Sequence, residues 1–123
     1  MTETNAKTPE FQTYDDFFAY YLTQHSTPVC RAWHYVGTVS AVSYFIWSLA
    51  SGNWVWGFLA VIIGYGCAWT GHFVFEGNKP ATFGHPGWSF ISDFRMLFLF
   101  ATGRLGKALD AALGAEEPVQ KVA

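Results

Sequence analysis

The longest uncharged stretch of the chain runs from Ala32 to Phe75 and has no Asp, Glu, Lys or Arg over 44 residues. Ser51-Gly52-Asn53, near its middle, is a turn signal. Helices over about Pro28–Ala50 and Trp54–Glu76 would each have roughly 20 largely apolar residues, enough to cross ~30 Å of hydrocarbon. The sequence therefore predicts an all-α fold, a small integral membrane helical bundle built on a two-span hairpin. A soluble helical hairpin is the alternative.

The composition and the distribution of charge agree with a membrane protein. Charged residues make up 13% of the chain, about half the share of an average soluble domain. Arg31 and Lys79 lie at the two open ends of the predicted hairpin, and its turn carries no charge. The positive-inside rule then puts both ends in the cytoplasm. We expect an inner-membrane protein in a bacterium, or a protein of the endoplasmic reticulum in a eukaryote, with its site on the cytoplasmic side.

The hairpin is flanked by shorter helical patterns. Apolar residues and one histidine recur at steps of three and four, which predicts a helix face that His25 continues; they are Phe11, Tyr14, Phe18, Tyr21 and His25. The pair Thr13 and Asp16 would cap this helix. It is too short to span, so we expect it to lie against the membrane surface or the bundle. The stretch from Trp88 to Gly103 is predicted as a re-entrant or interfacial helix, with a third span as the alternative.

The domain organisation follows from these segments. Residues 1–10 are polar and are predicted to be a disordered N-terminus. Residues 11–113 are predicted to form a single membrane-embedded helical domain. Residues 114–123 are predicted to be a flexible, solvated tail.

Two histidines are predicted to face each other at the open end of the hairpin. His34 lies 18 residues before Gly52 and His72 lies 20 residues after it, so their depths differ by roughly 3 Å at the helical rise. Small residues that include Gly37 and Gly64 share faces with them, and such residues let membrane helices approach closely. An ionisable residue inside a membrane segment is a functional candidate.

All four histidines fall on the same predicted side, together with two carboxylates. This convergence predicts a metal site with nitrogen and carboxylate ligands. Because Cys30 and Cys67 stand apart and form no CxxC pair, we expect no thiolate ligand. Such a ligand set suits iron, zinc, copper or manganese without distinguishing them. Glu76, four residues after His72, either supplies a ligand or orients a histidine.

Three segments carry a resemblance to a known family. They are His25-(eight residues)-His34-Tyr-Val-Gly-Thr, Gly71-His-Phe-Val-Phe-Glu-Gly-Asn-Lys-Pro-Ala81, and His85-Pro-Gly-Trp-Ser-Phe-Ile-Ser-Asp93-Phe-Arg-Met. The chain resembles the 2-hydroxy fatty acid dioxygenases from roughly Phe17 to Lys107. One departure is Cys30, where the family often has Asn.

The resemblance implies a membrane enzyme that uses Fe(II) and O2 to shorten a 2-hydroxy fatty acid by one carbon. It implies that the iron is bound by the family's histidines, which are His25, His34, His72 and His85 here. An octahedral ion has too few positions for four histidines, a bidentate substrate and O2. Either the substrate binds through one oxygen or one histidine is not a permanent ligand, and we would demote His25 first because the surface helix explains it. Glu76 and Asp93 are the candidate catalytic carboxylates, with Glu76 expected to orient a ligand. The candidate residues for holding the substrate carboxylate are Arg31, Lys79 and Arg95.

Other readings of the same residues remain open at this point. A membrane zinc hydrolase would use metal-bound water with Glu76 as general base. A haem carrier would use His34 and His72, and a structural hairpin would only hydrogen-bond its histidines. The net charge of −2 argues against nucleic acid as a partner. The expected partners are the 2-hydroxy fatty acid, O2 and membrane lipid, and a homodimer would bury more surface than a thin 123-residue bundle.

Overall fold

The computed structural model describes residues 11–80 and 84–122, and within them every regular element is helical. The elements are α1 (Tyr14–Thr23), α2 (Pro28–Ala50), the 3₁₀ helix η1 (Trp54–Phe58), α3 (Leu59–Thr70), the π-helix η2 (Gly71–Glu76), α4 (Pro86–Ala101) and α5 (Leu105–Val122). The prediction of an all-α fold is confirmed. The predicted disorder of residues 1–10 lies outside the described residues.

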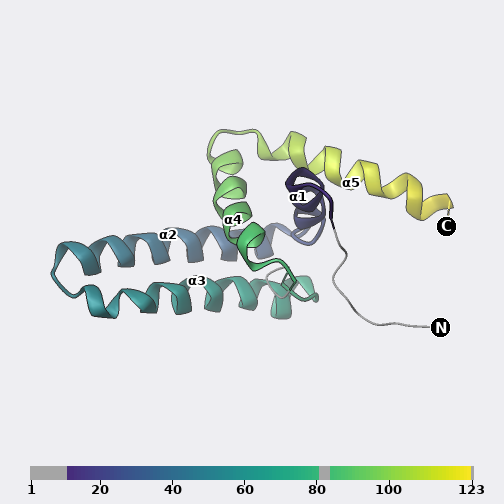
Figure 1. Cartoon of the computed structure of the whole chain (residues 1–123). Helices are drawn as coiled ribbons and strands as arrows, with labels where there is room; N and C mark the ends of the chain where they lie inside the picture. Colours follow the sequence, from purple (N-terminus) through teal and green to yellow (C-terminus); the bar gives the residue numbers. More distant parts are fainter. Residues whose placement is uncertain (1–10, 81–83, 123) are drawn as a thin grey trace. The chain divides into compact units, whose positions relative to one another are not determined.

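The chain divides into two compact units, His25–Lys79 and Met1–Gln24 with Pro80–Ala123. The first unit is the hairpin, in which α2 and α3 run side by side in opposite directions (Figure 1). The second unit holds α1, α4 and α5. The predicted single domain over 11–113 and the predicted flexibility of 114–123 stay predictions, although α5 continues to Val122.

The boundaries of α2 follow from its sequence. The Thr27 side chain accepts the Cys30 N–H at 3.2 Å, and Pro28 occupies the first turn, where its missing N–H is no loss. At the other end Gly52 takes a φ of 81°, a left-handed conformation that glycine adopts without strain. The Asn53 N–H then bonds to the Ser48 carbonyl at 2.9 Å and closes the turn. The predicted helix over Pro28–Ala50 and its turn are confirmed.

The return segment is helical from Trp54 to Glu76 but is not uniform. It starts as the 3₁₀ helix η1, continues as α3 and ends as the π-helix η2. Trp54–Glu76 is long and apolar enough to cross a membrane, and it is the one helix among the described residues that meets this test. The helical hairpin is therefore confirmed, but the prediction that both of its helices span a membrane is not, since only Trp54–Glu76 is a candidate span among the described residues.

The two long helices approach closely at glycines. A Cβ atom added at Gly37 would lie 2.7 Å from the Cβ of Cys67 and 3.1 Å from the Gly64 carbonyl oxygen. Since Cβ contacts below about 3 Å do not occur without movement, Gly37 sets the distance between α2 and α3. The prediction that small residues bring these helices together is confirmed.

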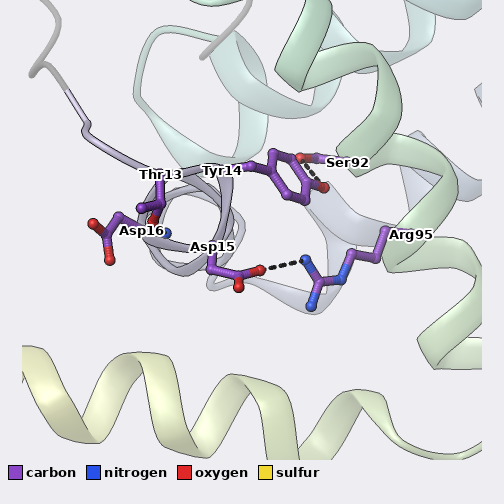
Figure 2. Close-up of polar contacts among 6 residues, drawn as sticks. All are labelled: Thr13, Tyr14, Asp15, Asp16, Ser92 and Arg95. Carbon is purple, nitrogen blue, oxygen red and sulfur yellow. Dashed lines mark hydrogen bonds and ion pairs between the residues drawn. The ribbon is translucent and has the colours of Figure 1, made fainter.

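The second unit is organised by α1. Thr13 caps this helix by accepting the Asp16 N–H at 3.1 Å, as predicted (Figure 2). The Tyr14 hydroxyl lies 3.0 Å from the Ser92 hydroxyl of α4. The buried apolar side chains of the unit are Phe17, Phe18, Tyr21, Leu22, Met96, Leu105 and Ala112.

One expectation about α1 is wrong. The helix ends at Thr23, and His25 lies in a turn instead of continuing the helix face. The reason is the start of α2. Thr27 must be extended, at φ −87° and ψ 138°, to cap the next helix ahead of Pro28. The chain therefore leaves α1 before His25.

Substituting Gly37 by alanine should separate α2 from α3. The overpacked Cβ is expected to cost about 1–3 kcal/mol, seen as a lower denaturation midpoint in detergent. Gly66→Ala is the matched control, because an added Cβ there meets no described atom within 4 Å. Equal midpoints for the two variants would contradict the close approach.

The carboxyl of Asp93 should make the stability of the protein depend on pH. Burial raises the pKa of Asp93 from its ordinary 3.8 to about 6, although the hydrogen bond that the Tyr21 hydroxyl donates to this carboxyl group acts to lower the pKa. The protonated form of Asp93 is thus favoured in the folded state. The stability that this form contributes to the folded protein is lost as the pH rises from about 4 to about 6. We expect Asp93→Asn to gain stability relative to wild type across that interval. Asp110→Asn, at an exposed position, should show no such gain in the same denaturation series.

Candidate metal centre

His34 is oriented by its own helix. Its Nδ1 lies 2.9 Å from the carbonyl oxygen of Cys30, one turn earlier in α2. A carbonyl only accepts, so Nδ1 carries the hydrogen and donates it. The lone pair of the ring is therefore on Nε2, which points away from the Cys30 carbonyl and is available to a ligand.

His72 is oriented by the turn that ends η2. Gly77 has a φ of 79°, a left-handed conformation that suits glycine. This turn aims the N–H groups of Gly77 and Asn78 at the His72 carbonyl oxygen, at 2.7 and 3.1 Å. It also brings the Asn78 Oδ1 to 2.8 Å from Nδ1 of His72. The amide oxygen accepts the Nδ1 hydrogen, so the lone pair of this ring is also on Nε2.

His25 completes a group of three imidazoles. Its Nε2 lies 3.0 Å from Nε2 of His34. The three ring centroids are 4.3, 4.4 and 4.8 Å apart, and the ring planes meet at 79°, 75° and 88°. All three rings are buried. Two nitrogens bound to one ion at about 2.1 Å and at right angles would lie about 3.0 Å apart, which is the separation between His25 and His34.

Cys30 belongs to the same group. Its sulfur lies 3.9 Å from Nδ1 of His34 and 3.9 Å from Nδ1 of His72, and the residue is fully buried. One ligand atom from each of the four residues His25, Cys30, His34 and His72 lies within 4.8 Å of the others. This buried cluster could hold a metal ion. Cys30 lies beside the rings because it is one helical turn before His34 and shares its face; the expectation that no thiolate binds the metal stays a prediction.

Glu76 binds the entry to α2. Its carboxylate accepts the N–H groups of Ser26 and Thr27 at 3.3 and 3.0 Å and the hydroxyls of both residues, the Thr27 contact being 2.8 Å. These bonds tie the end of η2 to the residue next to His25. In the structure Glu76 therefore holds the backbone of Ser26 and Thr27 in place. Its predicted catalytic role stays a prediction.

Arg31 braces the same segment. Its guanidinium donates to the carbonyl oxygens of His25 and Ser26 at 2.8 and 3.0 Å. Lys79, by contrast, is exposed and follows Asn78 directly. The predicted contact of either cation with substrate is untested and stays a prediction.

The remaining predicted site residues lie in the second unit. The His85 ring stacks on Trp88, and its Nδ1 is buried with no hydrogen-bond partner among the described residues. Asp93 accepts from Tyr21. Arg95 lies 4.0 Å over the Phe18 ring and 3.5 Å from Asp15 (Figure 2). Their predicted roles in metal binding, catalysis and substrate binding stay predictions.

Comparison with known proteins identifies the family of the chain. The family model described as 2-hydroxy-palmitic acid dioxygenase Mpo1-like matches residues 11–105. The chain belongs to this family. No curated protein and no solved structure matches it. The match covers all four residues of the cluster, so the buried imidazoles of this Mpo1-like chain lie within the part that defines the family.

Two residues of the centre were missed from the sequence. Cys30 could have been found from its spacing of four to His34. Asn78 gave no such signal, because its contact with His72 depends on the π-helix and on the left-handed Gly77.

Asn78 should control metal affinity through the orientation of His72. We expect Asn78→Ala to weaken Co(II) or Fe(II) binding by about 10–100-fold, the usual effect of losing the partner of a metal-binding imidazole. Asn78→Asp keeps an oxygen acceptor and should restore most of the affinity. The measurement is a metal titration in detergent, with helical content checked by circular dichroism.

Asn53→Ala is the control for that titration, because Asn53 lies in the hairpin turn and bonds to its near neighbours Ser48, Ser51 and Trp56. Wild-type affinity in Asn78→Ala, or equal loss in both alanine variants, would show that Asn78 does not position His72.

Proposed function

We propose that this protein is an Fe(II)-dependent dioxygenase that shortens 2-hydroxy fatty acids by one carbon. The observation that carries the proposal is the 3.0 Å separation of two imidazole Nε2 atoms within a buried group of three near-perpendicular rings. Membership in the Mpo1-like family supplies the substrate class. Imidazole-rich sites with open positions suit the Fe(II) of non-haem oxygenases.

The residues divide the work of such a site. His25, His34 and His72 would hold the ion, and when bound it would supply the activation of O2. The Cys30 carbonyl and Asn78 fix two of the rings through their Nδ1 atoms. Glu76 and Arg31 hold the turn that carries His25. Lys79, exposed beside Asn78, is the proposed partner of the substrate carboxylate because it is a cation near the cluster in sequence.

The surface of the hairpin supports a lipid substrate. A core helix of a soluble protein would be covered, but large apolar side chains of α2 and α3 are more than half exposed. They include Val36, Val39, Ile46, Val61 and Ile62. Exposed tryptophans gather near the turn, as in an interfacial belt; they are Trp47, Trp54 and Trp56. We propose that the hairpin lies in a membrane with its histidine end on the cytoplasmic side, so that an acyl chain can remain among apolar groups.

The competing functions fit the cluster less well. A hydrolase needs Glu76 as a base, but its carboxylate already accepts hydrogen bonds from Ser26 and Thr27. A haem needs its axial histidines on opposite faces of a porphyrin. The ring centroids of His34 and His72 are only 4.8 Å apart, which leaves no room for a porphyrin between them.

The proposed reaction has a balance that can be measured. The carbon that bears the hydroxyl is oxidised to a new carboxylate, and the original carboxylate leaves as CO2. A 2-hydroxy acid and one O2 then give a fatty acid one carbon shorter, CO2 and one water. All electrons come from the substrate, so no external reductant is needed.

The protein should consume O2 with a 2-hydroxy fatty acid after anaerobic loading with Fe(II). We expect O2 uptake and the shortened acid in a 1:1 ratio, measured by an oxygen electrode and mass spectrometry. His72→Ala should lose metal and reduce turnover at least ~100-fold, because it removes a ligand. The prediction that His85 also binds the ion is tested by metal analysis of His85→Ala.

The control substrate is the same fatty acid without the 2-hydroxyl group, which should give no uptake. Absence of O2 uptake by Fe(II)-loaded protein with the 2-hydroxy acid would defeat the proposal, and unchanged metal content in His72→Ala would defeat every metal-based function.

A further inference from the structure

The sulfur of Cys30 is the one donor of the cluster that the proposed dioxygenase does not use. It lies 3.9 Å from both His34 Nδ1 and His72 Nδ1. The packing that holds it there is tight, because a Cβ added at Gly71 would lie 3.3 Å from this sulfur and 3.1 Å from the Cys30 carbonyl. The thiol is therefore enclosed beside the rings.

Three imidazoles and one thiolate are a ligand set that zinc takes readily. Structural zinc sites are tetrahedral and use four protein ligands, among them mixed sets of Cys and His. Thiolate ligands favour thiophilic ions over those that prefer oxygen. A site for O2 chemistry instead needs open positions, so a fourth protein ligand on the ion would close it.

We propose that Cys30 gives this centre a second, closed binding mode for thiophilic divalent ions such as Zn²⁺. In this mode the ion is held by His25, His34, His72 and the Cys30 thiolate. The S–H bond breaks, the proton goes to solvent, a sulfur–metal bond forms, and no electron is transferred. The proposal deepens the proposed function and rests on it for the metal centre: zinc bound in this way excludes substrate and O2 and inhibits the enzyme.

This closed mode requires a movement of the Cys30 sulfur toward the ion. Donor atoms around a tetrahedral zinc with bonds of 2.0–2.3 Å lie about 3.3–3.8 Å apart. One ligand atom from each of the four residues lies within 4.8 Å of the others, with either ring nitrogen counted for a histidine. The sulfur, 3.9 Å from Nδ1 of His34 and of His72, must move toward their Nε2 atoms to share the ion. Rotation about the Cα–Cβ bond of Cys30 moves only the sulfur and can supply this. The backbone of Cys30 stays fixed in the first turn of α2.

Cobalt(II) provides the test, because it occupies zinc sites and its thiolate bond gives a charge-transfer band in the near ultraviolet. Metal-free wild type, Cys30→Ala and Cys67→Ala are titrated with Co²⁺ and then with Zn²⁺ in competition. Cys67 is the other free cysteine and serves as the matched control. We expect the band in wild type and Cys67→Ala only, and a loss of zinc affinity of about tenfold or more in Cys30→Ala, comparable to other changes at metal-binding residues. Fe(II) affinity should fall much less.

Each outcome of the titrations either supports or overturns the proposed Cys30 ligand. A missing band in cobalt-loaded wild type, or equal zinc affinity in wild type and Cys30→Ala, overturns the proposal. Should Cys30→Ala not fold, Cys30→Ser keeps the size and polarity of the side chain and must also lose the band. The proposed function is judged separately on wild type. A protein that shows the band but no Fe(II)-dependent O2 uptake keeps the closed binding mode and loses both the proposed function and its inhibition by zinc, and the reverse result keeps the function alone.

Discussion

The contact between α2 and the segment α3–η2 is the constraint on which the rest of the centre depends. It is possible because two positions in the contact have no Cβ: Gly37 against Cys67 and Gly71 against Cys30. His34 and His72 come from opposite sides of this contact, and their rings would not meet at 4.8 Å between centroids if the helices stood further apart. The spacing between the helices therefore determines the separation of the His34 and His72 rings.

The π-helix converts this contact into a centre with fixed orientations. Wider turns of this kind inside α-helices are frequent at functional sites, and here η2 contains His72 and ends at Glu76. Because the turn is wide, the chain can close back through Gly77 so that Asn78 reaches the His72 ring. Glu76 meanwhile reaches across to Ser26 and Thr27. One irregular turn therefore positions His72 directly and His25 through its neighbour.

The sequence predicted the parts of the fold that depend on local chemistry. Thr27 and Pro28 marked the start of α2, and the glycines and apolar runs predicted the hairpin and the pairing of His34 with His72. It did not predict the π-helix, because a single extra residue per turn leaves no clear mark on an apolar pattern. His25 was misplaced for a related reason. The spacing of three and four residues in the sequence continued to His25, whereas in the structure the cap of the next helix ends α1 at Thr23.

The three histidines do not play equal parts in the centre. The rings of His34 and His72 donate from Nδ1 to a carbonyl and an amide oxygen, so both keep their Nε2 lone pairs whether or not an ion is present. His25 faces the lone pair of His34 at 3.0 Å. A metal-free centre satisfies that contact when His25 carries its hydrogen on Nε2, and an ion requires His25 to give that hydrogen up. In the proposed metal centre His25 would therefore be the ring whose tautomer changes, while His34 and His72 form a preorganised pair. Glu76 and Arg31 hold the backbone at His25 and directly after it.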